Sequence, residues 1–252
     1  MKSHIGTKVL LSYPNLSSTN AVLLKMAGEE EIASWTIIKA SYQTKGRGQR
    51  SGFWFSSPEK NLLCSILLRP QMLRPDEQFL LNIVLSLAVY DTLYDFLRDE
   101  VIRIKWPNDV YVNAYKVAGL LIQNTIQGTS IQQSILGVGM NVNEDDFPTS
   151  LPGAKSMYGL TDSEYDIDEI LRRLVAHLEG YYHQLEKGLY DRLYELYESK
   201  LLGMNEMRNY RNLEGDKIQG IIRGVDKMGR LRLEVEGVIH LYSNKDLVFI
   251  FP

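Results

Sequence analysis

The chain has 252 residues, 44% of them hydrophobic and 23% charged, and its net charge of −3 goes with an isoelectric point near 5.9. This composition is typical of a globular protein, and the slightly negative charge argues against a global attraction to nucleic acid. The single cysteine, Cys64, excludes an internal disulfide and fits a reducing cytoplasm. The N-terminus lacks an apolar core with a cleavage site, so we expect no signal peptide.

The first expected elements are a helix that begins near Ser17 or Ser18 and a short β-rich strand over residues 34–41. A loop rich in glycine and cations follows, SYQTKGRGQRSGFWFSS, whose last part, GFWFSS, is compatible with a short strand. The apolar run NLLCSILLRP predicts a second strong strand that ends at Pro70.

A long helix is expected from Pro75, because proline followed by Asp76 and Glu77 suits the first turn of a helix. Its apolar core, FLLNIVLSLAVY, is shorter than the roughly 18 residues that a membrane span requires. We therefore predict a buried core helix and no membrane association.

The next segment predicts a strand, VIRIKW, then a hairpin with its turn at Asn113–Tyr115, then a strand interrupted by Gly137 and Gly139. About six strands around two helices, joined mostly by short turns, predict an α+β fold. We expect a mixed or antiparallel sheet with helices on one face.

The C-terminal part predicts an amphipathic helix that is capped by Asp166, and one further helix. From about Leu213 the sequence changes to short strands separated by glycines, which predicts a small β-barrel-like module. We therefore divide the chain into a larger domain, 1–212, and a module, 213–252.

Three polar constellations could carry chemistry. In the loop 42–54, Lys45, Arg47 and Arg50 lie among glycines, and such a loop can bind phosphate or carboxylate. The alternative is a solvated hairpin loop. At the start of the first helix, the segment SSTN could bind a small polar ligand or could simply cap the helix.

The third constellation is IKWPNDVYVNAYKVAGLL, in which Lys105, Asn108, Asp109 and Lys116 cluster around two apolar strands. The alternative is an ordinary turn with a solvated lysine. The sequence contains no P-loop and no complete dinucleotide fingerprint, and its four histidines are scattered. We therefore expect no metal site built on histidines.

Taken together and in this order, SSTN, TKGRGQ, KWPND, KVAG and GVGMN resemble the motifs of the biotin–protein ligases. The resemblance covers nearly the whole chain, from about Leu10 to the C-terminal module. It implies a class II aminoacyl-tRNA-synthetase-like catalytic domain and a C-terminal SH3-like β-barrel. Regulatory members of the family carry an N-terminal DNA-binding domain, whereas only about ten residues precede the catalytic region here. We therefore expect a stand-alone ligase that does not bind nucleic acid.

The resemblance implies an ATP-dependent, AMP-forming biotin–[biotin carboxyl-carrier protein] ligase. In the first step biotin and ATP give biotinyl-5′-AMP and pyrophosphate. In the second step biotin passes to a lysine of a carrier domain of a carboxylase, which is the expected partner. Mg²⁺ is expected to arrive with ATP rather than to occupy a protein metal site. The expected state is a cytoplasmic monomer or homodimer.

The resemblance also assigns the site residues. Lys116 and Arg47 are the expected catalytic cations. The expected biotin contacts are Ser18, Thr19, Asn20, Gln43, Gly46, Arg47, Gly48, Gln49 and Lys116. The expected ATP contacts are Arg50, Trp54, Asn108, Asp109 and Asn141.

The loop carries one departure from the family pattern. Gln49 stands where the family often has an arginine, and Arg50 follows one residue later. The glycines of the loop and its aromatic residues, Phe53 and Trp54, suit a lid that closes over a hydrolysable adenylate. Two alternatives remain: a lipoate–protein ligase of the same fold, and a non-catalytic biotin-binding sensor.

Overall fold

The structure is a computed structural model that describes residues 1–29, 31–49, 52–244 and 246–250. Its larger sheet has eight strands in the order β1-β2-β3-β4-β8-β7-β6-β5. Only β2 and β3 pair in parallel, so the sheet is mixed, as predicted. These strands are β1 (Lys2–Ile5), β2 (Lys8–Leu16), β3 (Ile37–Gln43), β4 (Leu62–Leu68), β5 (Ile102–Lys105), β6 (Asp109–Val112), β7 (Tyr115–Gln127) and β8 (Ser130–Met140).

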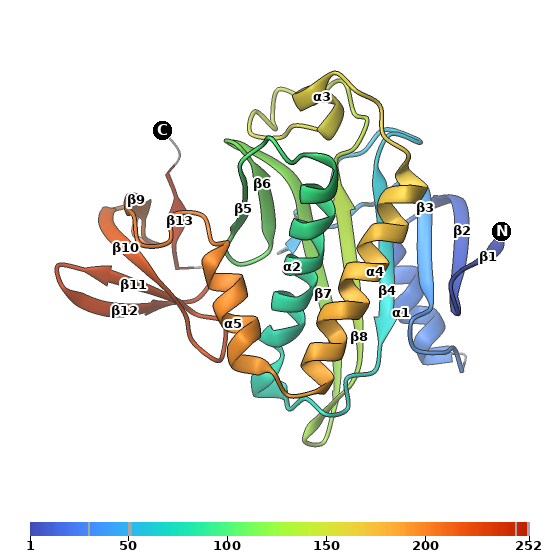
Figure 1. Cartoon of the computed structure of the whole chain (residues 1–252), viewed down its shortest axis with the longest axis horizontal. Coiled ribbons are helices and arrows are strands. Elements are labelled where there is room, and N and C mark those ends of the chain that lie inside the picture. Colours follow the sequence, from blue (N-terminus) through green and yellow to red (C-terminus); the bar gives the residue numbers. More distant parts are fainter. Residues whose placement is uncertain (30, 50–51, 245, 251–252) are drawn as a thin grey trace.

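Helices cover both faces of this sheet, but unequally. Figure 1 shows α2, α4 and α5 in front of the sheet and α1 behind it. Alternate residues of a strand face opposite sides, and accordingly Ile66 packs toward α2 whereas Leu67 packs with Leu23 of α1. The prediction of helices on one face is therefore right for α2, α4 and α5 and wrong for α1, which covers the other face. The helices are α1 (Thr19–Glu29), α2 (Phe79–Phe96), α3 (Met157–Thr161), α4 (Ile167–Glu186) and α5 (Tyr190–Ser199).

Helix α2 forms the centre of the main hydrophobic core. A 3₁₀ turn, Pro75–Glu77, precedes it, which agrees with the predicted start. The segment Pro75–Phe96 has the length and hydropathy of a membrane-spanning helix, but 72% of its most apolar window is buried inside the protein. The prediction of a buried core helix is confirmed.

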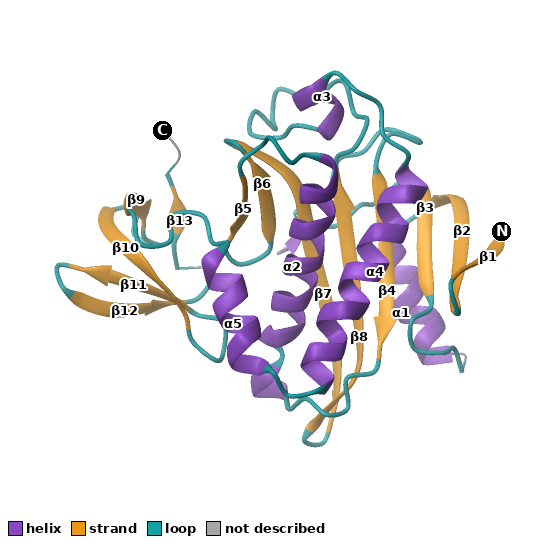
Figure 2. Cartoon of the chain, in the orientation of Figure 1, coloured by secondary structure: helices purple, strands orange, loops and turns teal. Residues whose placement is uncertain are grey.

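Five antiparallel strands form a second, smaller sheet in the order β12-β11-β10-β9-β13, at one side of the molecule (Figure 2). They are β9 (Met207–Arg211), β10 (Lys217–Val225), β11 (Leu231–Val235), β12 (Val238–Tyr242) and β13 (Val248–Phe249). The smaller sheet therefore takes in β9, which precedes the boundary drawn at 213. β9 is rich in polar residues and carries no glycine, so its sequence does not indicate that the smaller sheet begins there.

The two sheets are joined by buried contacts. The indole nitrogen of Trp106 donates a hydrogen bond of 2.8 Å to the carbonyl oxygen of Gly229. Gly229 has a positive φ of 80°, and a Cβ at this position would collide with the Phe79 ring, so glycine is required there. Phe79 packs edge-on against Tyr197 of α5. These contacts fix the smaller sheet beside the strand end that carries KWPND.

Three details differ from the sequence predictions. Residues 2–16 form β1 and β2, although no strand was expected there. The GFWFSS segment forms no strand among its described residues, and only an isolated bridge joins Phe53 to Arg47. Gly137 and Gly139 lie within β8 and do not interrupt it. Their close neighbours, described below, explain why glycine occurs there.

Candidate active site

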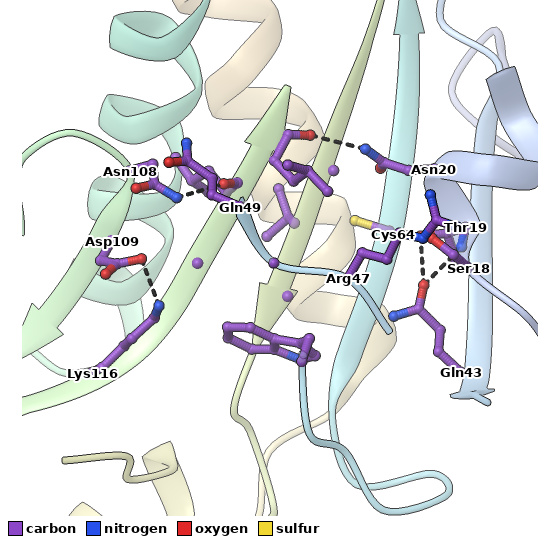
Figure 3. Close-up of a pocket in the computed structure, with 18 residues that line it drawn as sticks. Ser18, Thr19, Asn20, Gln43, Arg47, Gln49, Cys64, Asn108, Asp109 and Lys116 are labelled. Carbon is purple, nitrogen blue, oxygen red and sulfur yellow. Dashed lines mark hydrogen bonds and ion pairs between the residues drawn. The ribbon is translucent and has the colours of Figure 1, made fainter. Parts of the chain in front are cut away.

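One small cavity of about 60 Å³ brings together most of the predicted site residues. Its walls come from the start of α1, the end of β3, the following loop, the turn before β6, and the middle of β4, β7 and β8 (Figure 3). The lining residues are Ser18, Thr19, Asn20, Gln43, Arg47, Gly48, Gln49, Trp54, Cys64, Asn108, Asp109, Lys116, Gly119, Leu120, Leu121, Gly137, Val138 and Gly139.

The polar end of the cavity consists of Ser18, Thr19, Asn20 and Gln43. All four residues are buried, with exposed fractions of 3 to 8%. The backbone nitrogen and hydroxyl of Thr19 both lie within hydrogen-bond distance of Gln43 Oε1, at 2.7 and 3.0 Å. Because these groups sit on the first turn of α1 and the last residue of β3, the fold fixes their positions before any ligand is bound.

The glycine-rich loop folds back on itself above the cavity. The Trp54 backbone nitrogen donates to the Gly46 carbonyl at 3.1 Å, and Gly48 donates to the Gly52 carbonyl at 2.6 Å. A Cβ at Gly46 would lie 2.5 Å from the Trp54 carbonyl oxygen, so this close return requires glycine. The described part of the loop therefore folds back on itself, and its residues Arg47, Gly48 and Gln49 line the cavity.

The loop is also tied to the smaller sheet. The side-chain nitrogen of Asn244, which follows β12, donates a short hydrogen bond to Gln49 Oε1. This contact joins residues that are 195 positions apart in the sequence. The smaller sheet therefore touches the loop that covers the cavity, through the residue that departs from the family pattern.

The Trp54 ring lies in a slot on the surface of the sheet, over two neighbouring strands. A Cβ at Gly119 would lie 2.7 Å from the Trp54 ring, and a Cβ at Gly139 would collide with it. The two glycines, on the neighbouring strands β7 and β8, therefore form a flat surface for the indole. The indole nitrogen is buried and has no hydrogen-bond partner among the described residues.

The charged end of the cavity consists of Arg47, Asp109 and Lys116. Lys116 Nζ forms an ion pair of 2.6 Å with Asp109 Oδ1 and lies 5.6 Å from the centre of the Trp54 ring. Arg47 forms no ion pair with any described residue. Figure 3 places Asp109 and Lys116 on one side of Arg47, and Thr19 and Gln43 on the other. A surplus of positive charge next to a neutral polar end suits a ligand with one polar neutral part and one anionic part.

Lys105 adds a further cation behind this end. Its Nζ lies 3.8 Å from the Asp109 carboxylate and 5.0 Å from the centre of the Phe249 ring. Burial lowers the pKa of Lys105, Asp109 opposes this effect, and Lys116 adds to the lowering. Asp109 thus lies between the two lysines and holds Lys116, the nearer one, in place.

Two described residues of the predicted site, Gly46 and Asn141, do not line the cavity. Gly46 shapes the loop but does not line the cavity, and Arg50 lies outside the described residues. Asn141 is buried beside β7, where its side-chain nitrogen lies 3.4 Å from the Lys116 carbonyl and 3.2 Å from the Lys155 carbonyl. The structure therefore places Asn141 behind the backbone of Lys116 rather than in the cavity wall.

The sequence analysis missed several lining residues on β4, β7 and β8. Three of them, Gly119, Gly137 and Gly139, carried a usable signal, because glycine inside a strand often marks a close approach of another group. Cys64 gave no such signal. Burial raises the pKa of its thiol to about 12, so this cysteine is an unreactive part of the wall. The remaining members are Leu120, Leu121 and Val138.

Comparisons with known proteins agree with this arrangement. Residues 13–141 match the Biotin/lipoate A/B protein ligase family. The chain is 31% identical over 223 residues to the Biotin--[acetyl-CoA-carboxylase] ligase of Paracoccus denitrificans, covering 86% of this chain and 90% of the relative. It is 33% identical over 234 residues to the Bifunctional ligase/repressor BirA of Salmonella typhimurium, covering 90% and 69% of the two chains.

A solved structure extends the likeness to the whole fold. The biotin protein ligase from Aquifex aeolicus, in complex with biotin and ATP, superimposes with a TM-score of 0.79 at 26% sequence identity. The match covers 94% of this chain and 97% of that one. It therefore includes both the larger sheet and the smaller C-terminal sheet.

Proposed function

Because the chain belongs to the biotin protein ligase family, we propose that its cavity activates biotin with ATP and that biotin then passes to a lysine of a biotin carboxyl carrier domain. The observation that carries this proposal is the union, in one cavity, of a neutral polar end with a charged end that has surplus cations. The polar end suits the ureido ring of biotin. The charged end suits its carboxylate together with a phosphate.

The first step must bring two anions into contact. At about 4 Å, two unit charges repel by about 4 kcal/mol at an effective dielectric constant of 20. Arg47 and Lys116 offset this repulsion, and they do so most strongly where water is excluded. A carboxylate oxygen of biotin then attacks the α-phosphorus, the bond to the β-phosphate oxygen breaks, and pyrophosphate leaves. Asp109 orients the Lys116 ammonium for this task.

In the second step the lysine amine of the carrier attacks the carbonyl carbon of the biotinyl-adenylate. The bond between this carbon and the phosphate oxygen breaks, AMP leaves, and the amine loses a proton. Water would compete with the amine, so a closed loop favours transfer over hydrolysis. The Gln49–Asn244 hydrogen bond and the seated Trp54 ring are the contacts that hold the loop closed.

For the nucleotide, the proposed contacts are Trp54, Asn108 and Asp109, which line the charged end. Asn108 Nδ2 donates to the Leu120 carbonyl at 2.8 Å and is therefore already oriented. Asn141 does not line the cavity, and its side-chain nitrogen contacts the Lys116 backbone carbonyl. We assign Asn141 to positioning Lys116.

Mg²⁺ would neutralise phosphate charge when it is bound with ATP. Within the described residues, no group of three potential metal-ligating side chains is found, and Asp109 is the single carboxylate that lines the cavity. The metal would therefore be held by the nucleotide phosphates beside Asp109.

The test is biotin-dependent exchange of pyrophosphate into ATP, measured with purified protein. We expect exchange with biotin and none with lipoate. A thermal-shift measurement adds an independent readout, because a ligand at 100 times its Kd stabilises the folded state by about 2.7 kcal/mol. Stabilisation by lipoate alone would favour the lipoate ligase. Binding of biotin without exchange would favour a sensor.

The proposed setting is the cytoplasm, with a carboxylase carrier domain as the partner, no nucleic acid, and a monomeric or homodimeric protein. A smaller sheet that touches the loop through Asn244 supports a role of this module in the reaction rather than a merely adjacent position. We propose that residues 1–212 supply the reacting groups and that 213–252 help to close the loop.

A further inference from the structure

A second layer of buried side chains supports the polar end of the cavity. Ser65 on β4 is fully buried, and its Oγ lies 2.7 Å from Thr19 Oγ1 and 2.6 Å from Asn20 Oδ1. Asn20 Nδ2 lies 3.0 Å from the carbonyl oxygen of Leu121 and 3.1 Å from Gln123 Oε1. Gln123, on β7, is partly buried and lies outside the cavity wall.

The direction of each hydrogen bond in this chain follows from counting protons. A backbone carbonyl only accepts, so the Asn20 atom beside the Leu121 carbonyl must be its nitrogen. Asn20 therefore turns its oxygen toward Ser65. Ser65 has one hydroxyl proton, and the Asn20 oxygen cannot donate, so that proton belongs to the 2.6 Å contact.

The Thr19 hydroxyl proton then has two acceptors within reach, Ser65 Oγ at 2.7 Å and Gln43 Oε1 at 3.0 Å, and the shorter contact with Ser65 takes it. The length of this contact is that of a good O–H···O hydrogen bond. With its only proton directed to Ser65, Thr19 Oγ1 offers lone pairs alone to any ligand. Gln43 Oε1 still receives a hydrogen bond from the Thr19 backbone nitrogen at 2.7 Å.

The backbone of β8 leaves a closely fitting space for the Asn20 amide. A Cβ at Gly137 would collide with Asn20 Oδ1, so glycine at this position of β8 provides the space for the amide. Asn20 is 4% exposed, and in such surroundings an unmet hydrogen bond is costly. Every contact in the chain Gln123–Asn20–Ser65–Thr19 thus has a proton, and the longer contact of Thr19 Oγ1 with Gln43 Oε1 is the one without a proton.

We propose that Ser65, Asn20 and Gln123 act as positioning residues that make the Thr19 hydroxyl an obligate hydrogen-bond acceptor, so that the polar end selects a ligand bearing an N–H group at this point. The inference rests on the proposed function, in which this N–H belongs to the ureido ring of biotin. It assigns a role in specificity to Ser65 and Gln123, which the resemblance did not include.

The test measures biotin affinity by calorimetry, without ATP or carrier domain. Ser65→Ala removes both the acceptor of the Thr19 proton and the donor to Asn20 Oδ1, and it should weaken biotin binding about tenfold. Ser134→Ala is the matched control, because Ser134 is also a fully buried serine of this sheet, but its hydroxyl has no partner among the described residues. We expect the control to bind biotin within about twofold of the unchanged protein.

A double-mutant cycle separates positioning from a structural role. Thr19→Val removes the hydroxyl while keeping the shape of the side chain. If Ser65 acts through Thr19, Ser65→Ala should have little further effect on biotin affinity in the Thr19→Val background. Additive losses, in which Ser65→Ala still weakens biotin binding about tenfold in the Thr19→Val background, would overturn the proposal.

Gln123 provides a second test at a position that is less sensitive to folding. Gln123→Glu keeps an oxygen acceptor for Asn20 and should retain biotin affinity, whereas Gln123→Leu should weaken it about threefold. Equal biotin affinities of the unchanged protein, Gln123→Glu and Gln123→Leu would contradict the proposed role of Gln123. Failure of the unchanged protein to bind biotin would instead refute the proposed function, so the two failures are distinguishable.

Discussion

The polar end of the cavity holds its groups with neutral hydrogen bonds, whereas the charged end holds them with ion pairs and with a loop. At the polar end, Thr19 and Asn20 are buried and have defined partners on β3, β4 and β7. At the charged end, Arg47 has no ion-pair partner among the described residues, and the Trp54 indole nitrogen has no acceptor. The polar end is therefore preformed by the fold for the neutral ureido ring of the proposed ligand. The charged end is completed only when the carboxylate and phosphate of the proposed ligands bind.

The strongest test of this contrast is removal of the main cation. Lys116→Ala should lower the rate of adenylate formation about 10³-fold, because the repulsion between carboxylate and phosphate is no longer offset. Biotin affinity should change much less, since the polar end is unaltered. Pyrophosphate exchange and calorimetry measure the two quantities.

Lys155→Ala is the control for this substitution. Lys155 lies beside Lys116 through the bridge between Lys116 and Ala154, but it does not line the cavity. Its exchange rate should stay within about twofold of the unchanged protein. A wild-type exchange rate in Lys116→Ala would refute the assigned role of Lys116.

The slot for Trp54 gives the next largest effect. Gly139→Ala places a methyl group against the indole and should displace the ring, raising the KM for ATP about tenfold. Gly153→Ala is a suitable control, because nothing lies within 4 Å of a Cβ at Gly153. An unchanged KM for ATP in Gly139→Ala would show that Trp54 does not contribute to nucleotide binding from this slot.

Closure of the loop predicts a smaller, kinetic effect. Trypsin should cleave after Lys45 and Arg47, and after Arg50 outside the described residues, about fivefold more slowly when biotin and ATP are present. The reason is that ligands at the charged end stabilise the closed loop. Equal cleavage rates with and without both ligands would contradict a lid.

The smallest effect concerns the pH dependence of stability. Burial lowers the pKa of Lys105 in the folded state, so its ammonium group destabilises the fold at neutral pH. This cost disappears as the pH rises from the folded pKa toward the unfolded value of about 10.4. Relative to Lys105→Met, the unchanged protein should therefore gain stability as the pH rises from the folded pKa of Lys105 toward about 10.4. Urea denaturation of both proteins checks the sign, and a loss of relative stability over this range would contradict it.

The same two ends explain how far the sequence could predict the site. The charged end can be predicted from short stretches of the sequence, because the loop cations and KWPND each form a contiguous segment of unusual composition. The fold class likewise followed from strong strands such as β4 and from the periodicity of α4. The structure confirms the mixed sheet and the buried helix α2.

The polar end depends on pairings that no local pattern contains. Ser65 and Gln123 meet Asn20 only because β4 and β7 flank β8 in the sheet, and this strand order is not visible in the sequence. The role of Gly139 depends on Trp54, which reaches it from a distant loop. The Gln49–Asn244 contact depends on where the smaller sheet docks. Long-range side-chain partners were therefore the part that sequence reasoning could not supply.

The most direct test of the whole account is transfer of biotin to an acceptor. The protein is incubated with biotin, ATP, Mg²⁺ and a biotin carboxyl carrier domain, and the carrier is analysed by mass spectrometry. The account predicts a mass gain of one biotinyl group on one lysine, lost when ATP is omitted or when Lys116 is replaced by alanine. An unmodified carrier with biotin, or a mass gain with lipoate instead, would contradict it.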